Sequence, residues 1–233
     1  RATAQVFARE GAKVAVADVN VEGAEETVGL IKDAGCEAIF IRADVSQAAD
    51  TEAMVKKVVE TYGRLDCAFN NAGIEGDFQP ISDYPETTWN RVIGINLKGV
   101  WLSMKAEVQQ MLHQGSGAIV NTASVAGLQG MPAASAYSAA KHGVVGLTKT
   151  AALEYAKAGI RVNAVCPGGT DTPMLKRAFE KVPGMAEGIG AAEPVGRLAQ
   201  PTEIGEAVVW LCSDAASFVT GHPMAVDGGF VAQ

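Results

Sequence analysis

Short apolar segments alternate with amphipathic segments along the chain, and this alternation restricts the possible folds more than any other feature. Apolar runs such as Val14–Ala17 and Ala38–Ile41 are each followed by a helical pattern that ends at a glycine, such as Gly35 or Gly63. The runs have no polar face, which is typical of parallel strands covered on both sides by helices. The sequence therefore predicts an α/β fold with a doubly wound parallel sheet in three layers.

The pattern of apolar residues predicts where most helices and strands lie in the sequence. We expect helices at 1–10, 21–34, 46–62, 85–113 and 135–158 and from Pro201 onward, and strands at 13–17, 38–41, 65–69, 117–121, 161–166 and 224–226. Ser46 is the expected N-cap of the third helix. No repeat or linker divides the chain, so we expect a single domain over residues 1–233. The less regular segment 174–197 is expected to form a lid, with a plain surface loop as the alternative.

Composition excludes several classes of function. The net charge is −7, which provides no basic surface for nucleic acid. No apolar run approaches the roughly 20 residues of a membrane span, so none is expected. The four cysteines are scattered without a CxxC or Cys/His spacing, so we expect no metal site. Free thiols suit a reducing cytoplasm.

A tyrosine and a lysine are placed for acid–base chemistry. Tyr137 and Lys141 are four residues apart on a predicted helix and therefore share one face. A nearby ammonium can lower the pKa of a phenol, which makes it a usable proton donor and acceptor. Ser124 follows a predicted strand and can hold the reacting oxygen. The alternative is a surface pair on an amphipathic helix.

Two aspartates end predicted strands at the edge where ligands bind in parallel sheets. A carboxylate at Asp18 can accept hydrogen bonds from both hydroxyls of an adenosine ribose, and it repels a 2′-phosphate. Asp18 can instead cap the next helix, although Asn20 is better placed for that. Asp44, followed by Val45, can contact an adenine amino group or pair with Ser46 in a cap; the sequence favours neither.

Two further turns are candidates for cofactor contact. Asn70–Gly73 has small residues that allow a close approach to the backbone, or it is a plain turn. After Pro167 and Gly168, Thr170 and Thr172 can hydrogen-bond a carboxamide or a phosphate. Either threonine can also cap the next helix, and Pro173 favours that role for Thr172. A threonine can cap the next helix and contact the cofactor at the same time.

These residues together resemble the short-chain dehydrogenase/reductase family in its common form of roughly 250 residues, with the dinucleotide-binding Rossmann fold. The matching pieces are Asp18, Asp44-Val45, Asn70–Gly73, Asn96 in Gly94-Ile-Asn96, Ser124, Tyr137 with Lys141, Pro167-Gly168 with Thr172, and Val226–Gly229. Each piece is weak evidence alone, but their shared order and spacing are specific.

The resemblance implies a catalytic tetrad and a nicotinamide cofactor. Tyr137 would be the acid/base, Ser124 would position the substrate oxygen, Lys141 would tune Tyr137 and bind ribose, and Asn96 would hold a water linking Lys141 to solvent. The implied cofactor contacts are Asp18, Val19, Asp44, Val45, Asn71, Ala72, Gly73, Tyr137, Lys141, Pro167, Gly168, Thr170 and Thr172. A homotetramer is also implied, with helices 85–113 and 135–158 pairing across an interface.

One departure from the family pattern is large. The family begins with a central strand and a Gly-x-x-x-Gly-x-Gly turn that wraps the cofactor pyrophosphate, and neither is found here. We expect a preceding segment of roughly 15–20 residues to supply both. The preference for NAD over NADP therefore rests on Asp18.

The sequence predicts an NAD-dependent alcohol dehydrogenase or carbonyl reductase acting on a secondary alcohol or ketone. Apolar residues of the expected lid, Met174, Leu175, Phe179 and Met185, indicate an uncharged, partly apolar substrate, while Pro183, Gly184, Gly188 and Gly190 offer bending points. One alternative is an NADPH-dependent 3-oxoacyl-thioester reductase of the same family. Another is a nucleotide-binding regulator without turnover.

Overall fold

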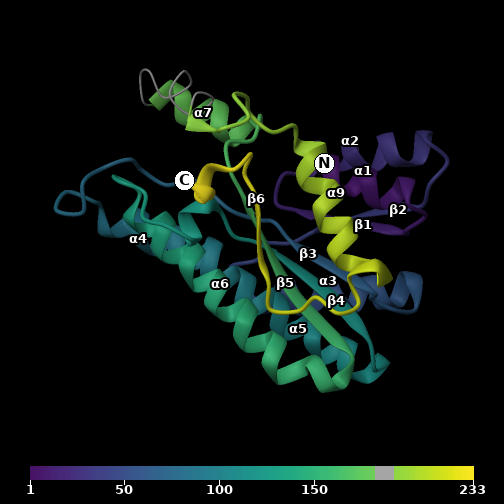
Figure 1. Cartoon of the computed structure of the whole chain (residues 1–233). Helices are drawn as coiled ribbons and strands as arrows, with labels where there is room; N and C mark the ends of the chain where they lie inside the picture. The colour runs from purple at the N-terminus through teal and green to yellow at the C-terminus, as the bar shows by residue number, and fades with distance from the viewer. Residues whose placement is uncertain (182–191) are drawn as a thin grey trace.

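A computed structural model describes residues 1–181 and 192–233 and shows strands alternating with helices (Figure 1). The strands are β1 (Val14–Asp18), β2 (Ala38–Arg42), β3 (Cys67–Asn70), β4 (Gly117–Thr122), β5 (Ile160–Pro167) and β6 (Pro223–Val226). The helices are α1 (Ala2–Arg9), α2 (Val21–Asp33), α3 (Ala48–Tyr62), α4 (Glu86–Ile93), α5 (Val100–Gln114), α6 (Ser135–Tyr155), α7 (Pro173–Lys181) and α9 (Pro201–Cys212).

All observed strand pairs are parallel. One ladder has the order β3-β4-β5-β6, with Phe69 opposite Val120 and Val120 opposite Asn163. A second ladder pairs β1 with β2 from Val14 opposite Ala38 onward. The carboxyl ends of these strands therefore point to the same edge in each ladder, where ligands bind in folds of this kind.

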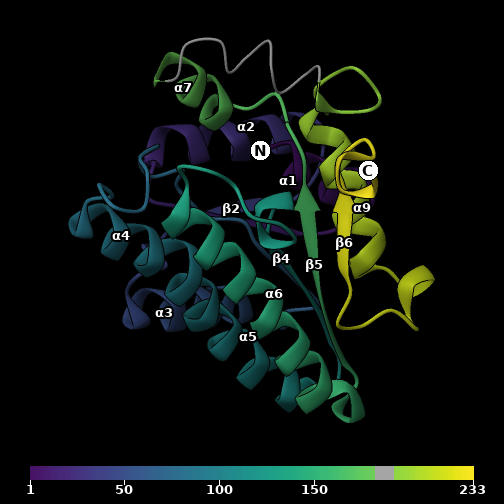
Figure 2. The same ribbon diagram turned by 60° about the vertical axis from the view of Figure 1, so that its left-hand side comes forward.

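Helices cover both faces of the sheet, as predicted (Figure 2). Side chains of α5 and α6 pack with Ile119 and Val162 on one face. On the other face, Val208 and Leu211 of α9 pack against Val120 and Val165. Neighbouring residues of one strand thus serve opposite layers, because side chains alternate along a strand. The predicted doubly wound α/β fold is confirmed.

The two ladders are not joined by hydrogen bonds in the described part of the chain, since β1 and β3 each have one unpaired edge. A parallel strand between these edges would join them into one sheet and satisfy their backbone groups. The expected preceding strand would fit this position, and it stays a prediction.

Two helix predictions need correction. The predicted helix 85–113 is interrupted by a π-helix at Gly94–Gly99, between α4 and α5. The third helix begins at Ala48 with Gln47 at the N-cap, not at Ser46, because Ser46 instead bonds to the side chain of Asp44.

Of the expected lid, α7 holds Met174, Leu175 and Phe179, whereas Pro183, Gly184, Met185, Gly188 and Gly190 lie outside the described residues.

Within residues 1–181 and 192–233, no helix combines the length and the apolar character needed to cross a bilayer.

Candidate active site

The structure brings Ser124, Tyr137 and Lys141 together. Ser124 follows β4, and its hydroxyl lies close enough to the Tyr137 phenol, near the start of α6, to lower the pKa of that phenol. The Lys141 ammonium, one turn further along α6, lies 5.5 Å from the centre of the Tyr137 ring. Lys141 is 3% exposed and donates a 2.7 Å hydrogen bond to the Thr122 carbonyl oxygen at the end of β4. An acid–base phenol, a hydroxyl and a buried cation therefore share one cluster.

Burial controls the protonation of this cluster. It raises the pKa of Tyr137, although the nearby Ser124 hydroxyl acts in the opposite direction and Glu75 raises the pKa further. Burial also lowers the pKa of Lys141 to about 8. The expected lowering of the phenol pKa by Lys141 is thus not the dominant effect in the protein alone, because removing both groups from water favours their neutral forms.

Asn96 lies in the π-helix and is fully buried. Its side-chain carbonyl accepts from the Ile74 N–H, and its amide donates to the Ile74 carbonyl oxygen, both at 2.8 Å. Single π turns within α-helices are frequent at functional sites. Asn96 therefore fixes the loop after β3 next to the cluster, and a Cβ at Gly73 would already lie 3.3 Å from its carbonyl oxygen.

A buried polar network that the sequence did not predict lies directly behind the cluster. The Asn70 amide donates to a Glu107 carboxylate oxygen and to the Asn121 side-chain carbonyl, each at 3.0 Å. Asn121 donates in turn to the Thr148 hydroxyl at 3.0 Å. The network joins β3, β4, α5 and α6 one residue before Asn71 and Thr122. No local pattern could have found Glu107, because its partner is 37 positions away.

The carboxyl of Glu107 makes stability depend on pH. Burial raises its pKa from 4.5 to about 7. Between these values the folded state holds a proton that the unfolded state has released, so stability falls as pH rises from about 4.5 to about 7. Above pH 7 the buried carboxylate costs on the order of 3 kcal/mol.

We expect Glu107→Gln to remove this pH dependence, because its amide oxygen still accepts from Asn70. The stability gain of the variant over the wild type should grow between pH 5 and 7.5 and then level off, as measured by urea unfolding at several pH values. The matched control is Glu154→Gln at an exposed position of α6. A constant difference at every pH would contradict this account.

The strand-end aspartates make local hydrogen bonds. Asp18 ends β1 and accepts from the Asn20 N–H at 2.9 Å, while Asn20 itself caps α2 by accepting from Gly23. Asp18 is exposed, as is the adjacent Val19. Asp44 accepts from the N–H and the hydroxyl of Ser46, which lowers its pKa. The structure thus shows the Ser46 pairing for Asp44.

The loop after β3 faces the same edge. Asn71 accepts a 3.2 Å hydrogen bond from the Thr122 hydroxyl and thereby joins the ends of β3 and β4. Ala72 beside it is exposed. Val45, after β2, packs so closely on the π-helix that a Cβ at Gly99 would lie 2.8 Å from it.

The loop after β5 is held by a residue that the sequence did not single out. Glu193 accepts a 2.7 Å hydrogen bond from the Gly169 N–H, and a Cβ at Gly168 would lie 2.6 Å from the same carboxylate oxygen. Thr170 donates to the Gly168 carbonyl oxygen at 3.2 Å. Thr172 accepts from the Leu175 N–H, so it caps α7. Pro167 ends β5, and the turn after it approaches Glu193 as closely as glycine allows.

The residues at the carboxyl ends of the strands fit both ends of a nicotinamide dinucleotide. Lys141 has further donors beyond its bond to Thr122 and lies beside Tyr137 and Ser124, which suits the nicotinamide ribose. The exposed carboxylate of Asp18 suits the adenosine ribose. Among the described residues, no group of three or more His, Cys, Asp or Glu side chains is placed to hold a metal ion.

Comparison with known proteins identifies the family. A family model described as "Enoyl-(Acyl carrier protein) reductase" matches residues 1–231. The chain is 46% identical to a cyclohexanol dehydrogenase of Acinetobacter sp. (strain SE19), over 100% of this chain and 90% of the relative. The chain belongs to the short-chain dehydrogenase/reductase family. A 2,5-dichloro-2,5-cyclohexadiene-1,4-diol dehydrogenase of Sphingobium indicum is 45% identical, over 100% of this chain and 92% of its own length.

Solved structures of this family agree with the fold. Levodione reductase superposes with a TM-score of 0.96 at 40% identity, covering 99% of this chain and 92% of that chain. An NAD⁺-bound xylitol dehydrogenase gives 0.93 at 36% identity, with 98% and 93% covered. An actinorhodin polyketide ketoreductase with NADPH also gives 0.93, at 38% identity, with 98% and 91% covered. Members with this fold thus bind one nicotinamide cofactor or the other.

Proposed function

We propose that this protein is an NAD-dependent dehydrogenase that interconverts a secondary alcohol and a ketone, with Tyr137 as the general acid/base. The supporting observation is that the Ser124 hydroxyl and the buried Lys141 ammonium both lie beside Tyr137, with the ammonium 5.5 Å from the centre of the phenol ring. Relatives named for their action on cyclohexanol and on a cyclohexadiene diol support the same reaction class.

A nicotinamide bound at this site would provide the hydride acceptor for alcohol oxidation and the hydride donor for ketone reduction. Ser124 and Tyr137 hold the substrate oxygen between two hydroxyls, which orients the reacting carbon. Tyr137 gives its proton to that oxygen in reduction and removes it in oxidation. Because burial raises the pKa of Tyr137, the phenol is protonated near neutral pH and ready to donate, whereas oxidation benefits from alkaline pH.

Lys141 and Asn96 support the phenol in different ways. We infer that Lys141 binds the nicotinamide ribose and stabilises the phenolate by its charge when it is protonated. Asn96 uses its side chain to fix Ile74, so its contribution to a proton path to solvent would come from the π-helix backbone around it.

The structure has a cavity of about 450 Å³ on the outer face of α5 and α6 and another of about 350 Å³ beside Ile74. The second is lined by Ile74, Glu75, Ile95, Arg91 and Arg177, and Glu75 also influences Tyr137 electrostatically. Glu75 pairs with Arg177 at 3.4 Å, which offsets charge within the lining. We propose that this cavity receives an uncharged, partly apolar alcohol, with α7 as part of a lid.

The cofactor preference follows from Asp18 in this account. A carboxylate at the adenosine ribose accepts its hydroxyls and repels a 2′-phosphate. We expect Asp18→Asn to reduce the preference of kcat/KM for NAD⁺ over NADP⁺ by about 10- to 100-fold, since like charges in contact cost several kcal/mol. Asparagine still accepts from Asn20, so the turn is preserved.

The control for Asp18→Asn is Asp33→Asn at the exposed end of α2. Equal changes in the two variants would contradict a role for Asp18 at the ribose. A wild-type preference for NADPH would favour the alternative 3-oxoacyl-thioester reductase. Cofactor binding without turnover of any alcohol would favour the nucleotide-binding regulator.

We further propose a homotetramer that uses the outer face of α5 and α6. The larger cavity there is lined by Ile93, Leu97, Trp101 and Leu147 beside Gly143 and Gly146, and Trp101 is 46% exposed. An apolar groove with an exposed tryptophan is typical of a subunit contact. Sedimentation at equilibrium should give four times the chain mass, and a monomer would refute the proposal.

The compartment we propose is the cytoplasm. All four cysteines are free in the structure, although two of them lie next to one another. Cysteines used as free thiols are typical of proteins in a reducing compartment.

A further inference from the structure

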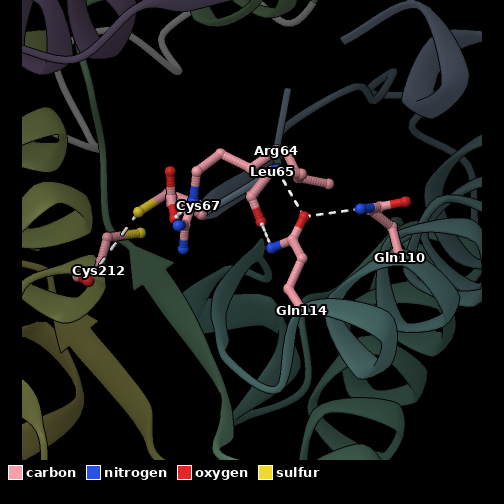
Figure 3. A network of polar contacts seen from close by, with 7 residues as sticks. Arg64, Leu65, Cys67, Gln110, Gln114 and Cys212 are labelled. Carbon is pink, nitrogen blue, oxygen red and sulfur yellow. Dashed lines mark hydrogen bonds and ion pairs between the residues drawn. The ribbon is translucent and has the colours of Figure 1, made fainter. Parts of the chain in front are cut away.

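Two of the four cysteines lie side by side at the amino end of the strands, away from the candidate active site. Cys67 begins β3 and Cys212 ends α9, 145 positions later in the sequence. The Cys67 thiol donates a hydrogen bond to the Cys212 carbonyl oxygen, with 4.0 Å between sulfur and oxygen, and the two thiols are close enough to shift each other's pKa. Figure 3 shows the two side chains pointing toward one another across the space between the strand and the helix.

The backbone on the Cys67 side is held from α5. The Gln114 side chain accepts from the Leu65 N–H and donates to the Leu65 carbonyl oxygen, both at 2.8 Å (Figure 3). Gln110 donates a further 2.8 Å hydrogen bond to the Gln114 side-chain oxygen. These contacts fix the start of β3 two residues before the thiol.

The backbone on the Cys212 side is held by Arg161 of β5. Its guanidinium donates to the carbonyl oxygens of Leu211 at 2.6 Å and of Cys212 and Ser213 at 3.1 Å each. This cap fixes the end of α9 and places a positive charge beside both sulfurs. Because both backbones are already fixed in the folded state, forming a bond between the two sulfurs costs little further chain entropy.

The surroundings also activate one thiol. The pKa of Cys67 is lowered, mainly by its interaction with the Cys212 thiol and also by Arg161, while burial and the carboxylates of Asp66 and Asp214 oppose the shift. The pKa of Cys212 is raised by the same interaction and by burial. Both side chains are half-buried, so a small oxidant can reach them. The pair combines a nucleophilic thiol with a neighbouring thiol able to resolve its oxidation.

We propose that Cys67 and Cys212 form a site of reversible oxidation that joins β3 to α9 by a disulfide. The oxidant is a peroxide. The Cys67 thiolate attacks one peroxide oxygen, which breaks the O–O bond and yields a sulfenic acid and, for hydrogen peroxide, hydroxide. The Cys212 sulfur then attacks the Cys67 sulfur and releases the oxygen as water. In total, two thiols and one hydrogen peroxide give one disulfide and two waters.

The test is to expose the folded protein to a small molar excess of hydrogen peroxide and then to map its peptides by mass spectrometry. We expect a linked pair of peptides containing Cys67 and Cys212, a loss of two titratable thiols per chain, and recovery of both with dithiothreitol. Cys67→Ser and Cys212→Ser should each prevent the link. Cys36→Ser should behave as wild type, since the Cys36 thiol instead bonds to the Ala8 carbonyl oxygen.

A second measurement asks whether the bond fits the native fold. Closing a long loop restricts the unfolded chain, so oxidation should raise the Tm by about 5–10 °C in wild type and leave the Tm of Cys212→Ser unchanged. A link between two chains, oxidation of Cys67 to a sulfinic acid without a link, no loss of thiols, or an unchanged wild-type Tm would each overturn the proposal. None of these readouts depends on enzyme turnover.

Discussion

Tyr137→Phe should lower kcat by about 100- to 10,000-fold, the usual contribution of a positioned general acid/base. The variant removes one oxygen atom and keeps the ring, which lies 5.5 Å from the Lys141 ammonium. The Ser124 hydroxyl loses a polar neighbour but keeps its hydrogen bond from the Ala126 N–H, and the backbone of α6 is unaffected. Cofactor affinity, measured by quenching of protein fluorescence with NADH, should stay within about twofold.

The matched control is Tyr155→Phe at the other end of α6, where a phenol is likewise replaced on the same helix. That variant should keep its turnover. If Tyr137→Phe retained more than a tenth of the wild-type kcat, the phenol would not be the group that moves the proton. Loss of NADH affinity in parallel with turnover would instead indicate a structural role.

Lys141→Met should lower kcat/KM by about 100- to 1,000-fold and weaken NADH binding about tenfold or more. Two contributions of the ammonium are lost together. Its charge no longer stabilises the phenolate, and its donors no longer reach the cofactor ribose. The buried Thr122 carbonyl oxygen also loses its 2.7 Å hydrogen bond.

The pH dependence separates the two roles of Lys141. Its pKa of about 8 predicts that wild-type kcat/KM changes with an ionisation near that value, and this ionisation should be missing in Lys141→Met. Lys149→Met, two turns along α6 and exposed, is the control and should show the wild-type profile. An unchanged profile in Lys141→Met would show that another group titrates.

The sequence predicted the fold well because its signals are local. Strands β2, β4 and β5 match their predicted positions within about two residues, since continuous apolar runs bounded by glycine or proline leave few alternatives. The π-helix at Gly94–Gly99 was not predicted, because no residue type or spacing in the sequence distinguishes the backbone hydrogen bonds of a π turn from those of an α turn. The helix start at Ala48 was missed because Ser46 had a better partner in Asp44.

The part of the site that the sequence predicted also has local signals. Tyr137 and Lys141 share a helix face by spacing alone, and Ser124 follows a strand that ends beside them. Glu107, Glu193 and the Cys67–Cys212 pair depend on contacts between distant segments, which no spacing in the sequence reveals. The direction of the Tyr137 pKa shift also needed the structure, because it depends on how deeply the phenol is buried.

The central claim is that hydride passes directly between the carbinol carbon of a secondary alcohol and a nicotinamide at the Ser124–Tyr137–Lys141 cluster. The most direct test incubates the protein with NAD⁺ and cyclohexanol carrying deuterium at the carbinol carbon. The account predicts reduced nicotinamide with one deuterium at C4, formed more slowly than from unlabelled alcohol. Reduced nicotinamide without the label would contradict the account, and so would the absence of any reduction across a panel of cyclic and open-chain secondary alcohols.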